Sequence, residues 1–189
     1  MPIARALAGW ALCALLGALP VQAAPVPAAP VPAAPGPAVP VGTFAIEGAP
    51  DLEARGLYHF LYLHPSGRFL MAAEWAGHES SRAAGRWEAG ASGITLTGTA
   101  HVETNQGRWD VPFRREFRWE RAAERLVPLP EKNRFGMLGW PNAYRFKSAQ
   151  PVSSLPPEKL PRDEAGLLAL MRALETAASP PTVSPPAAR

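Results

Sequence analysis

Residues 108–120 read Arg-Trp-Asp-Val-Pro-Phe-Arg-Arg-Glu-Phe-Arg-Trp-Glu, and this run says more about the fold than any other part of the chain. Successive side chains of a β-strand point to opposite faces, so a two-residue rhythm separates a buried face from a wet one. The odd positions are apolar except for Arg115: Trp109, Val111, Phe113, Phe117 and Trp119. The even positions are charged except for Pro112. The run therefore predicts a long strand whose apolar face needs a covering layer and whose charged face meets water.

Shorter strands are expected on both sides of this one. Residues 56–63 and 68–75 predict a hairpin, because both alternate and Pro65 and Gly67 favour a turn between them. Residues 76–83 are expected to form a polar loop, and further strands are predicted at 85–88, 94–99, 101–103, 124–129 and 143–147. Pro112 predicts a bend, a bulge or an edge position within the long strand. Together these segments predict a mainly β fold, an antiparallel meander that closes into a small barrel or a sandwich.

The first 23 residues have the pattern of a secretory signal peptide. Arg5 gives the positive start, residues 6–19 the apolar run, and residues 21–23 a small-residue cleavage site. The alternative is an uncleaved anchor, which Pro20 and the short apolar run disfavour. Leu12 precedes Cys13, the only cysteine, where a lipoprotein signal requires a small residue. We expect a periplasmic or secreted protein without disulfides and without stable membrane insertion after cleavage.

Composition divides the rest of the chain into segments. Residues 24–42 are a Pro/Ala-rich linker, which is either a plain tether or a ligand for a proline-binding module. Residues 43–148 contain every aromatic residue except Trp10 and are predicted to be the antiparallel β domain. Residues 149–160 form a Pro-rich connector, and residues 178–189 are expected to be a disordered tail. Residues 161–177 predict a helix that packs on the β domain, with Pro161 in its first turn and an apolar stripe formed by Leu167, Leu170, Met171 and Leu174.

Several short motifs resemble those of small bacterial lipocalin-like barrels of the calycin type. They are Gly56-Leu57-Tyr58, Gly67-Arg68-Phe69, Gly85-Arg86-Trp87 and Ile94-Thr95-Leu96, followed after more strands by one helix. The resemblance implies a cup of antiparallel strands with a helix on its side, which often holds an apolar ligand. In lipocalins the Gly-x-Trp motif opens the barrel, whereas here Gly85-Arg86-Trp87 follows a complete hairpin.

Arg115 is the most informative candidate for a site, since unbroken alternation would point its guanidinium into an aromatic interior. There it needs a carboxylate partner, a position open to water or an anionic ligand. The alternatives are a bulge that turns Arg115 outward and a position at the barrel end. Residues 136–142 predict a flexible loop in which Trp140 serves as a lid, as a partner-binding tip or as a plug of the open barrel end. The candidate ligand-binding residues are Arg115, Trp87, Trp109, Phe113, Phe117 and Trp140.

Signals for catalysis are weak. None of the four histidines lies two or four residues from another, so no metal site is predicted, and His59 is expected to be a core histidine. Phosphate-loop, dinucleotide and Gly-x-Ser-x-Gly motifs do not occur, so neither a catalytic residue nor a cofactor is predicted. Acids alternate with arginines between residues 108 and 125, so no nucleic-acid partner is expected.

The first functional hypothesis is therefore an exported, non-catalytic binding module whose barrel holds a small, partly apolar ligand. The second is an envelope interaction or structural protein that docks on another protein through the β domain. A secreted inhibitor or an unrecognised type of enzyme is a third alternative. The sequence leaves the oligomeric state open.

Overall fold

The computed structural model of the chain describes residues 38–131 and 135–177. The predicted signal peptide (1–23), most of the linker (24–37 of 24–42) and the tail (178–189) lie outside the described residues. Within the described part of the chain, no helix is both long enough and apolar enough to cross a membrane.

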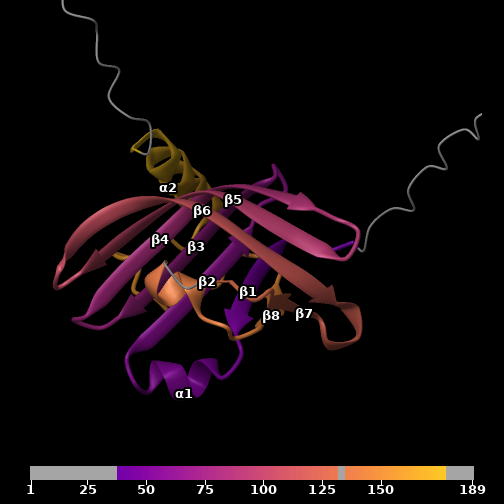
Figure 1. The fold of residues 1–189 in the computed structure, drawn as a ribbon, viewed down its shortest axis with the longest axis horizontal. Coiled ribbons are helices and arrows are strands. Elements are labelled where there is room, and N and C mark those ends of the chain that lie inside the picture. The colour runs from indigo at the N-terminus through magenta and orange to yellow at the C-terminus, as the bar shows by residue number, and fades with distance from the viewer. Residues whose placement is uncertain (1–37, 132–134, 178–189) are drawn as a thin grey trace, which may run out of the picture. The chain divides into compact units, whose positions relative to one another are not determined.

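Eight antiparallel strands form a closed barrel in which every strand pairs with its neighbours in sequence, and β1 pairs with β8 (Figure 1). This confirms the predicted antiparallel meander and selects a barrel over a sandwich. The strands are β1 Gly42–Ile46, β2 Leu57–Leu63, β3 Arg68–Trp75, β4 Glu79–Ala89, β5 Gly93–Thr104, β6 Gly107–Glu120, β7 Arg125–Pro128 and β8 Tyr144–Ser148. The helical segments are α1 Ala49–Glu53, η1 Arg121–Ala123, η2 Gly136–Gly139 and α2 Glu164–Ala177.

The predicted hairpin is confirmed as β2 and β3, which pair from Leu57↔Trp75 to Leu63↔Phe69. Three local predictions are wrong. Residues 76–83 are not a loop throughout, because β4 begins at Glu79 and absorbs the short strand predicted at 85–88. The strands predicted at 94–99 and 101–103 are one strand, β5, and neither β1 nor α1 was predicted. The small side chains of β4 explain the first error, because Ala83 and Ala84 are buried on opposite faces of the sheet and give the sequence no apolar–polar alternation.

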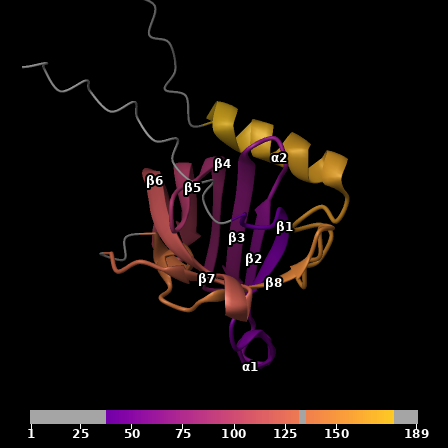
Figure 2. The ribbon, with the colours of Figure 1, turned by 90° about the vertical axis from the view of Figure 1, so that its right-hand side faces the viewer.

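The strands carry two separate apolar clusters, one on each face of the sheet. The inner cluster fills the barrel with residues such as Phe44, Leu61 and Phe113. The outer cluster contains Phe60, Tyr62 and Leu70 together with other residues of β2, β3 and β4, and α2 covers it with Leu167 and Met171. Figure 2 shows α2 lying across these strands on the side of the barrel opposite to α1. The predicted helix therefore packs on the barrel wall, as its apolar stripe requires.

The start of α2 differs from the prediction. The helix begins at Glu164, so Pro161 precedes it and is not part of its first turn. The Asp163 carboxylate accepts a hydrogen bond of 2.8 Å from the backbone N–H of Gly166, which makes Asp163 the N-cap. A hydrogen bond of 2.8 Å between His64 Nε2 and the Glu164 carboxylate and an ion pair of 3.1 Å between Arg68 and Glu175 also tie the helix to the barrel.

Strand β6 confirms the two-residue rhythm from Val111 onward. Phe113, Arg115, Phe117 and Trp119 are buried, and the residues between them are exposed or half-buried. Trp109 is a correction, because 40% of its surface is exposed although it was placed on the buried face. It lies on the part of β6 that β7 does not reach, since β7 pairs only with residues Phe117 to Glu120. Pro112 lies on this same edge, as one of its predicted alternatives required.

Two glycines let strands β4 and β5 approach each other closely. Gly85 and Gly98 face each other across the two strands, and an added Cβ would lie 2.2 Å from the Thr97 carbonyl oxygen and 2.0 Å from the Ala84 carbonyl oxygen, respectively. Their lack of side chains lets the strands approach, and the neighbouring inward residues Ala83 and Ala100 are also small. The segment around η2 contacts β3 and β4.

Candidate functional site

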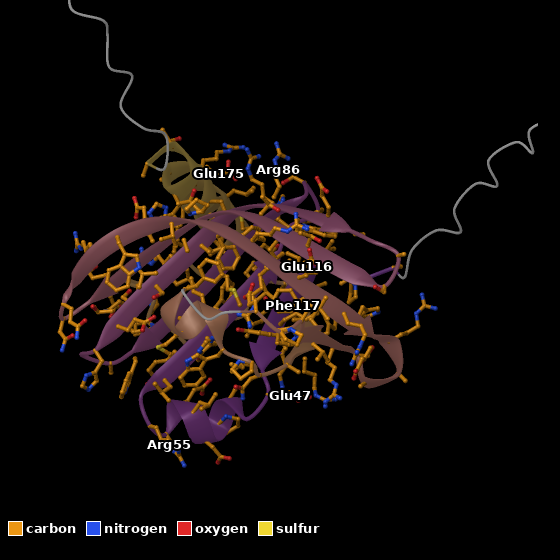
Figure 3. The ribbon with its side chains drawn as sticks, viewed as in Figure 1. Glu47, Arg55, Arg86, Glu116, Phe117 and Glu175 are labelled. Atoms are coloured by element: carbon orange, nitrogen blue, oxygen red, sulfur yellow. The ribbon has the colours of Figure 1, made fainter. Side chains whose placement is uncertain are left out.

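Arg115 lies inside the barrel and is 1% exposed. Its register with β5 is continuous, so the predicted alternative of an outward bulge is wrong, and its burial excludes a water-exposed position at the barrel end. It follows Phe113 on the inner face and precedes Phe117, over whose ring its Cζ atom lies at 5.1 Å from the centroid. Phe117 and its outward-facing neighbour Glu116 are labelled in Figure 3. The site therefore has a cation stacked on an aromatic ring in an apolar interior.

Both groups that compensate the Arg115 charge come from the segment between β7 and β8. The Nε atom lies 3.4 Å from Oε1 of Glu131, and Nη2 donates a short hydrogen bond to the Trp140 carbonyl oxygen. The separation of 3.4 Å is that of an ion pair without hydrogen-bond alignment, so Nε and Nη1 make no hydrogen bond to the described residues. A buried guanidinium with only part of its donors satisfied is costly. The interaction of Arg115 with this segment is therefore weaker than that of a bidentate ion pair.

His59 and Tyr144 complete the polar cluster. Burial and, to a smaller extent, the Arg115 charge lower the pKa of His59 to about 3, so its imidazole is neutral near neutral pH. Nδ1 of His59 lies 3.5 Å from the Tyr144 hydroxyl, and burial raises the pKa of that hydroxyl although Arg115 opposes the shift. The prediction of a core histidine is confirmed. The cluster thus carries one positive charge, two neutral polar groups and the Glu131 carboxylate at its margin.

The segment that includes η2 fills the barrel next to Arg115. Phe135 is 1% exposed, and its ring centroid lies 4.9 Å from that of Phe113. Met137 and Leu138 are equally buried. The backbone N–H of Met137 donates to the Glu79 carboxylate at 2.7 Å, and this contact fixes the turn. Side chains crowd the space that the strands enclose (Figure 3).

Trp140, predicted to serve as a lid, a partner-binding tip or a plug, packs against the inner cluster from its margin. The apolar residues that enter the barrel are those just before it, whereas Trp140 is half-buried and its ring centroid lies 5.4 Å from that of His59. Its contribution to Arg115 is its carbonyl oxygen, which a sequence motif cannot indicate.

The structure brings together three of the six predicted site residues, Phe113, Arg115 and Phe117, and adds Trp140 through its backbone. Trp87 packs against the inner cluster from its margin and donates its indole N–H to the His64 carbonyl oxygen at 2.9 Å. Trp109 lies apart at the exposed edge. Sequence reasoning missed Glu131, Tyr144 and Phe135, because nothing local marks a residue that meets Arg115 or Phe113 only after the barrel closes.

Five pockets on the described residues have volumes between about 240 and 450 Å³, and none of these five is lined by Phe113, Arg115 or Phe117. The one of 450 Å³ lies between α1, strands β1 and β8, and Val152–Ser154, and its lining includes Phe44 and His59 of the barrel interior. Within residues 38–131 and 135–177 no group of three His, Cys, Asp or Glu side chains is placed to hold a metal ion. The side chains of Phe135, Met137 and Leu138 are buried in the inner cluster that surrounds Arg115.

The fold defines the class of protein: an eight-stranded, all-antiparallel closed β-barrel with a C-terminal helix, an arrangement consistent with a calycin-like fold. No protein family, curated protein or solved structure was found to match the chain.

Proposed function

We propose that this protein is a non-catalytic binding module whose barrel holds a small, partly apolar molecule that carries an anionic group. The observation that supports this proposal is the position of Arg115. It is fully buried in an aromatic interior, and one segment of the chain supplies both its carboxylate partner and the apolar side chains beside it. The predicted signal peptide would place this activity in the periplasm or outside the cell.

The segment indicates the chemistry of the ligand that could replace it. Glu131 presents a carboxylate to Arg115, while Phe135, Met137 and Leu138 fill the apolar space. A molecule with one anionic group and an apolar body offers the same two contacts and competes with the segment for the interior. The segment is either inside the barrel or displaced from it. A ligand shifts the equilibrium between these two states only by the difference between its affinities for them. Weakening the internal competitor therefore strengthens ligand binding.

Calorimetric titration with decanoate tests this proposal, with decanol as the uncharged control of the same chain length. We expect decanoate to bind and decanol to bind more weakly. Glu131→Gln should bind decanoate more tightly than the unmodified protein, because it removes the competing carboxylate, whereas Glu116→Gln, on the outer face of β6, should leave the affinity unchanged. The proposal fails if neither the protein nor its Glu131→Gln variant binds the acid, or if acid and alcohol bind equally well.

Docking on an envelope protein is a second candidate. Trp75 and Trp109 are 43% and 40% exposed on hairpins at the same end of the barrel, and the Trp75 ring lies 4.3 Å from that of His78. Exposed tryptophans are frequent anchors of protein interfaces. Photo-crosslinking from position 75 in intact cells should then yield one adduct of defined mass, and this candidate fails if the crosslinker captures nothing.

A further inference from the structure

The first half of β6 has an open edge. Strand β5 pairs with β6 from Gly107 to Arg118, whereas β7 reaches only the end of β6. Residues 107–112 therefore have no second strand partner among the described residues, and all six are exposed except the half-buried Val111. An exposed edge with free backbone groups is a template for another strand.

Two hydrogen bonds show which residues direct their backbone groups toward this edge. The N–H of Trp119 donates to Ser92 on the β5 side, and the carbonyl oxygen of Glu116 accepts from Leu129 on the β7 side, both at 2.9 Å. Successive residues of a strand point their backbone groups to opposite edges, and the register with β5 is unbroken. The even-numbered residues Arg108 and Asp110 thus present N–H and C=O groups to the open edge.

We propose that a second copy of this chain pairs with this edge in antiparallel orientation, about a two-fold axis at Trp109. In this register Arg108 lies opposite the second copy's Asp110, and each of these pairs exchanges two backbone hydrogen bonds. Trp109 lies opposite its own symmetry mate at a position without such bonds, where opposing Cα atoms are about 4.5 Å apart and side chains are closest. The two barrels then share a continuous sheet through β6.

The sequence around Trp109 favours a second copy over an unrelated strand, because it is complementary to itself. A two-fold axis at residue 109 sets each arginine opposite an aspartate, on the outer face, and each tryptophan opposite a tryptophan. Pro112, which has no N–H, does not block this register, since it would face Gln106 in the turn beyond the strand. The pairing between the two copies therefore ends before Pro112, which has no N–H to donate.

The side chains involved are available for this contact. Arg108 and Asp110 pair within the monomer with Glu103 at 2.7 Å and with His101 at 2.8 Å, respectively. The side chains of Arg108 and Asp110 are 77% and 56% exposed, so water screens these pairs and they compete weakly with a cross-strand contact. The exposed ring of Trp109 loses its contact with water on pairing. This proposal does not depend on the ligand proposed above.

Sedimentation equilibrium of the full chain over a range of concentrations tests the proposal. We expect a monomer–dimer equilibrium that Arg108→Asp weakens by about tenfold or more, because it sets aspartate opposite aspartate twice. The double variant Arg108→Asp with Asp110→Arg restores opposite charges in the same register and should restore the dimer. A chain that stays monomeric up to about 1 mM, or a folded double variant that does not recover, overturns the proposal.

A cysteine pair gives an independent measurement of the axis. In a Cys13→Ser background, Trp109→Cys should form a disulfide-linked dimer under mild oxidation, because its symmetry mate lies directly opposite. Trp75→Cys is the matched control, since Trp75 is similarly exposed but its strand β3 has partners on both sides. Equal crosslinking of the two variants would indicate random collision and would also overturn the proposal.

Discussion

Replacing Arg115, which is buried, and replacing Glu131, its partly exposed partner, should have different consequences for stability. Arg115→Met removes the charge from the barrel and leaves a flexible apolar side chain among Phe113 and Phe117. Glu131→Gln removes the carboxylate and leaves a buried guanidinium with the Trp140 carbonyl oxygen and an aromatic ring as its contacts. We therefore expect the arginine to be dispensable for stability and the glutamate to be required.

The structure sets the magnitudes. Breaking a fully buried ion pair by removing one partner costs about 3–5 kcal/mol, but Glu131 is 26% exposed, so we expect a loss of about 2 kcal/mol for Glu131→Gln. Arg115→Met loses one hydrogen bond to a carbonyl oxygen, but it no longer has to bury a charged guanidinium. The free energy of unfolding of this variant should therefore lie within about 1 kcal/mol of that of the unmodified protein or above it. The pair Arg114 and Glu116 on the outer face of the same strand is the control, and Glu116→Gln should change stability by less than about 1 kcal/mol.

Urea-induced unfolding, followed by tryptophan fluorescence and circular dichroism, measures these differences as shifts of the midpoint at constant slope. The double variant Arg115→Met with Glu131→Gln should recover most of the stability that Glu131→Gln loses, because no uncompensated charge remains. If Arg115→Met is less stable than Glu131→Gln, the guanidinium contributes net stability to the filled barrel. The burial of Arg115 would then no longer support an anionic ligand.

Three further outcomes follow from individual contacts. His59 has a folded-state pKa of about 3, below the ordinary value of about 6.5. The free energy of unfolding should therefore fall by about 1.4 kcal/mol for each pH unit as pH falls below 6.5. Urea titrations at several pH values should show that His59→Leu removes this dependence. Gly98→Ala should cost about 3 kcal/mol or prevent folding, since its Cβ would meet the Ala84 carbonyl oxygen at 2.0 Å, whereas Gly90→Ala, with its nearest contact at 3.9 Å, should be tolerated; thermal unfolding separates the two. Asp163→Ala should lose about 1 kcal/mol through the missing cap of α2, and faster amide exchange confined to the first turn of the helix would report it.

The β class, the hairpin of β2 and β3, the inward direction of Phe113 and Phe117, and the existence of α2 are all predictable from sequence, because each depends on a local period. Two-residue alternation and a stripe at positions 167, 170, 171 and 174 are properties of short segments, and such segments keep their geometry in any fold that covers their apolar face. The local errors occur where this signal is absent. Strand β4 was shortened because small and polar residues carry no hydrophobic contrast.

The tertiary structure decided everything that requires segments distant in the chain to meet. Closure of β1 on β8 chose a barrel over a sandwich, and it brought Tyr144 next to His59 although 85 positions separate them. The segment between β7 and β8 buries Phe135, Met137 and Leu138 in the inner cluster, and it gives Arg115 its carboxylate. The two-residue alternation of β6 predicts that Arg115 faces inward, but only closure of the sheet determines which groups surround it.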